Sequence, residues 1–257
     1  MDVAGKVLLQ QKTADGGTIR IWQQDNLRYL DFDDQLWQSA IDINQPGCLP
    51  LSLNRAMLAG AVFSEPVQRV LLAGTGGGAT ARFLAQQFPY IDGEAVEISA
   101  DVAGLAWRYF DFPDSWPIHI ADIQHYLQQS QSAYDLILLD IAEDNKTPDW
   151  ILNRPFLQQC RDRLTGQGHL ALNLLVDDAA AFLQALATIR SVFDRRTVCL
   201  SLQHHRNIVV LAFNAAPVFL PPVDKLRLQM LEQQWSIELT DFYQQMQKEN
   251  PAGSGIF

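Results

Sequence analysis

The chain has 257 residues, of which 48% are hydrophobic and 19% are charged, so it is long enough to bury a sizeable core. Its formal net charge is −10 and its isoelectric point is about 4.8. This charge argues against a nucleic-acid partner, because phosphates require a basic face. No apolar run reaches the length needed to cross a membrane, and no segment reads as a secretory signal. We therefore expect a cytoplasmic protein with no membrane partner.

The cysteines and histidines predict neither a disulfide framework nor a metal site. Cys48, Cys160 and Cys199 are odd in number and widely spaced. The five histidines show no HExxH or comparable ligand spacing. We expect a metal-free protein.

The first 45 residues predict a small N-terminal β-hairpin region. Residues 17–33 alternate apolar and polar side chains on both sides of Asp25-Asn26, a favourable turn pair. Residues 7–11 predict a further strand. After a Pro/Gly-rich loop at 44–50, residues 51–63 have helical spacing.

Residues 46–257 predict a Rossmann-like nucleoside-binding transferase domain with a C-terminal helix. Predicted strands and helices alternate, which indicates an α/β doubly wound sheet, mostly parallel, with helices on both faces. The strands are expected at 69–74, 94–99, 118–122, 134–140, 168–175, 196–202 and 207–213, and the helices at 80–88, 101–110, 123–130, 150–164, 178–193 and 222–247. Only four residues join the last two strands, so we expect the last strand to be antiparallel.

The stretch "VLLAGTGGGATARFL", residues 70–84, places a glycine-rich turn between a buried strand and a helix. In that arrangement backbone N–H groups and a helix N-terminus face a ligand. Gly74 fits the tight turn, and the missing side chains of Gly76 and Gly78 allow a ligand to approach the backbone. A glycine-rich turn is also common without any ligand, so the turn alone does not indicate a binding site and further residues are needed.

Three acidic residues end the strands that follow the loop. Glu97 comes roughly 20 residues after the glycines, where a carboxylate accepts both ribose hydroxyls of a nucleoside. Asp122 and Asp140 end the next two strands, and the carboxyl ends of parallel strands share one crevice. Asp122 has an alternative interpretation as a helix cap.

These motifs resemble the spermidine synthase (polyamine aminopropyltransferase) family, within the class I S-adenosylmethionine-dependent transferase fold. The family's "RVLVIGGGDGG" is similar to "RVLLAGTGGGAT", and its "VEID" to "VEIS" with Glu97. Its "GD" before a helix is similar to Ala121-Asp122, and its "YDVIIVDSSDP" to "YDLILLDIAED" with Asp140. "LWQS", which contains Gln38, resembles the family's "VVQS".

The resemblance implies that S-adenosylmethionine or its decarboxylated form is a co-substrate and that a small amine is the acceptor. Glu97 would then bind ribose, Asp122 would read the adenine, and Asp140 would act as the general base. Gln38 and Glu143 match positions that contact substrate. The family resemblance also implies a homodimer.

The acceptor side departs from the family pattern. The aspartate of the family's glycine loop is Gly77 here, and the second aspartate of "DSSDP" is Glu143. The family's "YHE" aligns with Asn54-Arg55-Ala56, where the charge of Arg55 is expected to repel a diamine or to pair with an anion. Three alternatives stay open: a methyltransferase that uses intact S-adenosylmethionine, an NAD-dependent oxidoreductase, and a non-catalytic nucleoside-binding relative.

Overall fold

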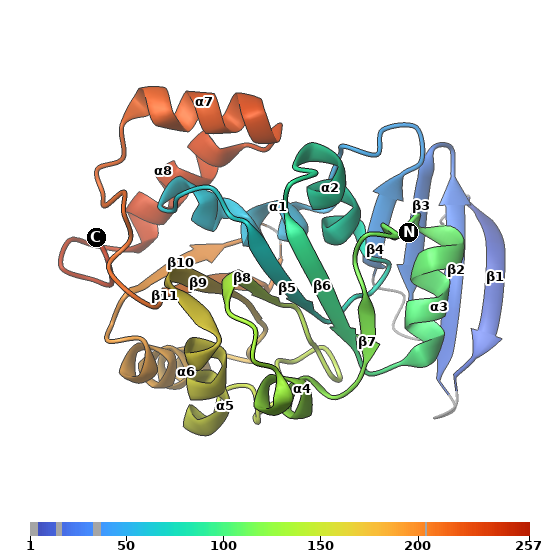
Figure 1. The fold of residues 1–257 in the computed structure, drawn as a ribbon, viewed down its shortest axis with the longest axis horizontal. Helices are drawn as coiled ribbons and strands as arrows, with labels where there is room; N and C mark the ends of the chain where they lie inside the picture. The colour runs from blue at the N-terminus through green and yellow to red at the C-terminus, as the bar shows by residue number, and fades with distance from the viewer. Residues whose placement is uncertain (1–4, 14–16, 33–36, 204) are drawn as a thin grey trace.

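The computed structural model describes residues 5–13, 17–32, 37–203 and 205–257, which form two β-sheets and the helices around them (Figure 1). The smaller sheet is antiparallel and consists, in order, of β1 (Lys6–Lys12), β2 (Thr18–Gln24), β3 (Leu27–Asp31) and β4 (Trp37–Asp42). The larger sheet has the order β10-β11-β9-β8-β5-β6-β7; its strands are β5 (Arg69–Ala73), β6 (Asp92–Glu97), β7 (Ile118–Ile120), β8 (Tyr134–Leu139), β9 (Leu164–Leu174), β10 (Thr197–Ser201) and β11 (Ile208–Phe213). The helices are α1 (Ser52–Met57), the 3-10 helix η1 (Ala59–Val62), α2 (Ala79–Gln87), α3 (Ala100–Tyr109), α4 (Ile123–Gln129), α5 (Arg154–Asp162), α6 (Ala179–Val192), α7 (Lys225–Trp235) and α8 (Leu239–Glu249).

The larger sheet confirms the predicted doubly wound topology. Strands β7, β6, β5, β8 and β9 pair in parallel, whereas β11 is inserted antiparallel between β9 and β10. The short β10–β11 connection enforces this reversal, because a parallel neighbour requires a long crossover. Residue 204 of that connection lies outside the described residues.

Each face of the larger sheet carries its own hydrophobic core. Side chains alternate across a strand, so Val70 and Leu72 of β5 enter one core and Leu71 and Ala73 enter the other. Helices α1, α2, α3, α7 and α8 cover the first core, and α4, α5 and α6 cover the second (Figure 1). Because both faces are covered, the strands read as continuous apolar runs. Within the described part of the chain, none of the helices is long and apolar enough to span a bilayer.

Some predicted elements differ from the structure. The single helix expected over 222–247 is two helices, because Ser236 adopts a left-handed backbone with φ of 52° between α7 and α8. The helix expected from residue 150 begins only at Arg154, after the side chain of Asn153 caps the N–H of Phe156. The N-terminal hairpin is part of a four-stranded sheet, since β4 adds a strand that the sequence pattern did not predict.

The smaller sheet lies beside α2 and α3, which brings β4 next to the glycine turn (Figure 1). The guanidinium of Arg82 in α2 is buried and donates to the backbone carbonyl of Asp42 at 3.0 Å. Arg28 of β3 donates to the carbonyl of Tyr109 in α3. These contacts fix the smaller sheet against the larger-sheet part of the chain, while the division of the chain at residues 45 and 46 stays a prediction.

Candidate functional site

The glycine turn lies at the carboxyl edge of the larger sheet, between the strands that end in Glu97 and Asp140. Strand β5 pairs with β6 on one side and β8 on the other. The N–H of Gly74 donates to the carbonyl of Val96 at 3.0 Å, and the N–H of Asp140 donates to the carbonyl of Ala73 at 2.9 Å. Parallel pairing thus brings together residues that are 66 positions apart in the chain.

The glycines of the turn lack side chains for different reasons. Gly74 has φ of 86°, and a Cβ there would lie 2.1 Å from the carbonyl oxygen of Asp140. At Gly78 a Cβ would lie 2.3 Å from the ring of Phe112, so packing and not a ligand explains that glycine. At Gly76 the nearest protein atoms to a Cβ are 3.7 Å away, on Gln38 and Ser39. Its φ of 51° by itself favours glycine, and among Gly74, Gly76 and Gly78 it is the position with space beside it.

Glu97 is buried, and both its oxygens accept backbone hydrogen bonds. Oε2 accepts from the N–H of Thr75 at 2.9 Å, and Oε1 accepts from the N–H of Ser99 at 3.0 Å. Glu97 therefore braces the glycine turn. Each carboxylate oxygen has further lone pairs, so both can still accept from a ribose hydroxyl.

Two apolar side chains next to these acids are unusually exposed. Ile98 follows Glu97 and is 73% exposed, and Ile120 at the end of β7 is 50% exposed. Large aliphatic groups in this position offer surface that a flat nucleobase would cover. Sequence reasoning missed both, although each lies beside a predicted site acid.

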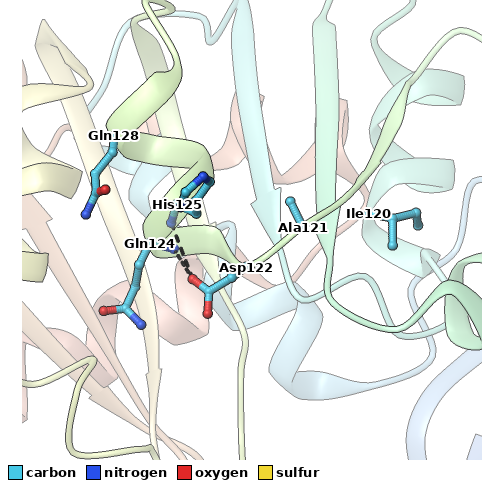
Figure 2. A pocket seen from close by; sticks show the side chains of 6 residues that line it. All are labelled: Ile120, Ala121, Asp122, Gln124, His125 and Gln128. Carbon is cyan, nitrogen blue, oxygen red and sulfur yellow. Dashed lines mark hydrogen bonds between the residues drawn. The ribbon is translucent and has the colours of Figure 1, made fainter. Parts of the chain in front are cut away.

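Asp122 caps helix α4, as one of the two sequence interpretations predicted. Its Oδ1 accepts from the N–H groups of Gln124 at 2.7 Å and His125 at 3.4 Å (Figure 2). Its Oδ2 takes no part in these bonds. Asp122 lines an open depression of about 610 Å³ together with Ile120 and Ala121 (Figure 2). The cap fixes the carboxylate at the depression that the exposed Ile120 also lines, and Oδ2 stays outside the cap.

The carboxylate of Asp140 is held by one amide, which is itself held by a second amide. Asn173 of β9 donates from Nδ2 to Oδ1 of Asp140 at 2.8 Å, and Asn207 donates from Nδ2 to Oδ1 of Asn173 at 2.9 Å. Among the described residues, no group donates to Oδ2 of Asp140. Burial raises the pKa of Asp140 above the usual aspartate value, and the bond from Asn173 opposes that rise. Sequence reasoning missed Asn173, whose signal was a polar residue near the end of an apolar strand.

The structure places the two predicted substrate residues differently. Gln38 lies on β4, and its backbone carbonyl is near Gly76, so it belongs to the wall of the site. Glu143 is exposed on a tight turn, in which the backbones of Glu143 and Lys146 exchange two hydrogen bonds of 2.9 Å. No hydrogen bond or ion pair of the described residues links the Glu143 side chain to the other site residues.

Arg55 does not present a free charge to the crevice, contrary to the expectation from the sequence. Its Nε donates to both carboxylate oxygens of Glu238 at 2.9 Å, and its Nη1 donates to the carbonyls of Leu49 and Pro50. The ion pair neutralises the charge locally and fastens α1 to the start of α8. The argument that Arg55 repels a diamine therefore fails.

The space beside Gly77 is filled by protein. A Cβ at Gly77 would lie 2.8 Å from the ring of Phe110 and 2.8 Å from Oγ of Ser39. Phe110 is fully buried, so it has little freedom to move aside. The family's loop aspartate is thus absent here, and the turn is packed in a way that excludes it.

The fold was compared with solved structures. A probable spermidine synthase from Corynebacterium glutamicum has a TM-score of 0.72 and 18% identity, covering 89% of this chain and 86% of that one. A spermidine synthase in complex with the transition state analogue AdoDATO has a TM-score of 0.66 and 18% identity, covering 87% and 78%. Human methyltransferase-like protein 13 in complex with SAH has a TM-score of 0.64 and 24% identity, covering 74% and 93%. The chain shares the overall fold of these structures, which is a methyltransferase-like fold.

Sequence comparison gives a more specific relationship. No family model matches the chain. A polyamine aminopropyltransferase of Chromobacterium violaceum is 26% identical over 241 residues, which cover 92% of this chain and 92% of the relative. The human eEF1A lysine and N-terminal methyltransferase is 29% identical over 161 residues, which cover 54% of this chain and 23% of that protein. The chain is a homologue of the polyamine aminopropyltransferases, and methyltransferases are among its relatives.

Proposed function

We propose that the protein transfers an aminopropyl group from decarboxylated S-adenosylmethionine to a small amine, and that Asp140 is the general base. The observation that carries this proposal is the placement of Asp140. The backbone of Asp140 lies against the glycine turn, and its carboxylate is fixed through Oδ1 by Asn173, while Oδ2 takes no part in that bond. The homology to polyamine aminopropyltransferases over nearly the whole chain supports the same conclusion.

The donor's adenosine would occupy the edge formed by β5, β6 and β7. In this arrangement Glu97 accepts the ribose hydroxyls, Ile98 and Ile120 cover the faces of the adenine, and Oδ2 of Asp122 accepts from its amino group. The open space at Gly76 lets the donor lie against the backbone. Each of these groups supplies an acceptor or an apolar surface where the adenosine has a donor or an apolar face.

The chemistry requires a neutral amine, because an ammonium has no free electron pair. Asp140 takes a proton from the acceptor ammonium, and the amine nitrogen then attacks the methylene carbon beside the sulfonium. The new C–N bond forms as the C–S bond breaks, and its electron pair goes to sulfur, which leaves as the neutral thioether methylthioadenosine. Since the leaving group is neutral, catalysis consists mainly of alignment and proton transfer. A pKa of Asp140 raised by burial brings the base closer to the working pH.

A second candidate is methyl transfer from intact S-adenosylmethionine, and Gly77 favours it. A carboxylate at that position would bind the amine of an aminopropyl tail and would repel the carboxylate of a methionine tail. Here the position is occupied by Phe110 and Ser39, which carry no charge. The methyltransferase relatives are consistent with this alternative.

A product assay separates the two candidates. The wild type is incubated with decarboxylated S-adenosylmethionine and a panel of diamines, and in parallel with intact S-adenosylmethionine, and the nucleoside product is measured. We expect methylthioadenosine, and its formation should fall by about 10²–10⁴-fold in Asp140→Asn. The matched control, Asp149→Asn, changes an exposed aspartate of the loop that follows Asp140 and should keep wild-type activity. Adenosylhomocysteine without methylthioadenosine would favour the methyltransferase.

A further inference from the structure

We propose that Asn173 and Asn207 act as a positioning pair, which holds the carboxylate of Asp140 in the orientation and ionisation state that a general base requires. This inference rests on the proposed function, in which Asp140 is the base. It assigns a role to two residues on strands that the glycine-turn motifs do not include. Neither residue needs to touch the substrate for this role.

The direction of the hydrogen bonds determines what the pair does. Asn207 donates to the carbonyl oxygen of the Asn173 amide at 2.9 Å, which leaves the Asn173 NH₂ group pointing at Asp140. If that amide were reversed, its oxygen would face the carboxylate, and two acceptors would repel each other. The carboxylate, which only accepts, therefore fixes the orientation of the Asn173 amide, and the bond from Asn207 to the amide oxygen strengthens that preference.

The fold keeps this pair rigid. Asn173 is buried on β9, and its backbone carbonyl accepts from Oγ1 of Thr147 at 3.2 Å. Asn207 lies just before β11, whose antiparallel insertion beside β9 brings the two amides together. A buried amide with a fixed partner on each side has one low-energy arrangement. The carboxylate of Asp140 therefore accepts from the NH₂ group of Asn173 in a fixed geometry.

The charged side chains on the neighbouring elements have partners other than Asp140 or lie exposed. Lys146, from the loop after β8, and Arg206, from the β10–β11 connection, both bind Asp177 beyond β9. Glu97, at the end of β6, accepts from backbone N–H groups, and His205 lies next to Arg206 in an exposed position. The effects that act on the pKa of Asp140 are burial, which raises it, and the bond from Asn173, which lowers it. Loss of the amide donor should therefore raise that pKa.

The test uses Asn207→Leu, which removes the N–H group that donates a hydrogen bond to Asn173 and adds no charge. A hydrogen bond to a charged group is equivalent to roughly one to two pKa units, so an indirect loss should raise the pKa of Asp140 by about one unit. On the acid side of the kcat–pH profile, the pH at which kcat falls to half should rise by the same amount. At pH values below that point kcat should be about tenfold lower than in the wild type, and the KM for decarboxylated S-adenosylmethionine should not change. The matched control is Gln203→Leu, an exposed residue of the same connection, which should leave the profile in place. An unshifted acid side in a folded Asn207→Leu, or an equal shift in the control, overturns the proposal.

A second readout separates this inference from the proposed function. The pKa of Asp140 can be followed without turnover by ¹³C NMR of the side-chain carboxyls, with Asp140→Asn used to assign the signal. The variant Asn207→His carries an N–H donor, Nδ1, at the same reach from the backbone as the Asn amide and should restore most of the wild-type pKa. If the protein shows no aminopropyl transfer but the pKa still rises in Asn207→Leu, the proposed function fails and the positioning pair stands. If the pKa is the same in the wild type and Asn207→Leu, the positioning pair is wrong whatever the activity.

Discussion

Replacing Gly77 by aspartate restores the residue of the family motif, and the structure predicts that the protein loses stability instead of gaining activity. An ideal Cβ at Gly77 would lie 2.8 Å from Cδ1 of Phe110, 2.9 Å from its Cγ, and 2.8 Å from Oγ of Ser39. Carbon atoms in contact prefer 3.5–4.0 Å, so the ring must shift by more than about half an ångström. Phe110 is fully buried, and overpacking of this kind costs about 1–3 kcal/mol.

The assay is thermal unfolding of Gly77→Asp beside a matched control, Gly166→Asp. A Cβ at Gly166 meets no atom within 4 Å, so the control should melt close to the wild type. In a chain of this size each kcal/mol lowers Tm by about 2–4 °C. A double variant with Phe110→Leu should recover part of the loss, because the two positions share one space. A Gly77→Asp protein that melts with the wild type would refute the packing argument.

Three further changes test the site and the core. Glu97→Gln should weaken methylthioadenosine binding in calorimetry by at least about tenfold and also lower Tm, since the amide cannot accept from both the Thr75 and Ser99 N–H groups and the ribose. Gly76→Val should lose that binding, because its side chain enters space that the protein leaves open, and it should also lower Tm, because a β-branched residue is strained at the φ of 51° of Gly76. Burial lowers the pKa of His169 to about 4, so the unfolded chain binds the extra proton first and stability is lost as pH falls from about 6.5 to about 4. The wild type should lose about 3 kcal/mol of its free energy of unfolding over this pH range, and His169→Gln should lose much less, as measured by urea titrations. A pH dependence that is the same in both proteins would contradict this prediction.

Much of the fold could be predicted because its signals are local. The apolar runs of β5 and β8 indicate strands that are buried on both faces, and the glycine turn indicates the start of α2. Asp25-Asn26 predicted the β2–β3 turn, and the short β10–β11 connection predicted antiparallel pairing. Other features depend on contacts that are distant in the sequence. Strand β4 pairs with β3, but its sequence does not alternate clearly between apolar and polar residues. The break between α7 and α8 at Ser236 contains no Gly or Pro that would predict it.

In the candidate site, too, some residues could be predicted from the sequence and others depend on tertiary contacts. Gly74, Glu97 and Asp140 could be placed together from the sequence, because the carboxyl ends of parallel strands meet at one edge. The filling of the Gly77 position could not be foreseen, since Phe110 follows another helix and reaches the turn only through tertiary packing. The bond between Arg55 and Glu238 joins residues that are 183 positions apart, so no local pattern reports it.

The central claim is that this crevice binds an adenosyl donor whose tail carries no carboxylate. Isothermal titration calorimetry of decarboxylated S-adenosylmethionine, S-adenosylmethionine and methylthioadenosine, measured side by side on the wild-type protein, tests it most directly. The account predicts that all three bind through the adenosine and that the decarboxylated donor binds at least as tightly as the intact one. Binding of intact S-adenosylmethionine at least tenfold more tightly than the decarboxylated form would contradict the proposed donor, and no binding of any of the three would contradict the site itself.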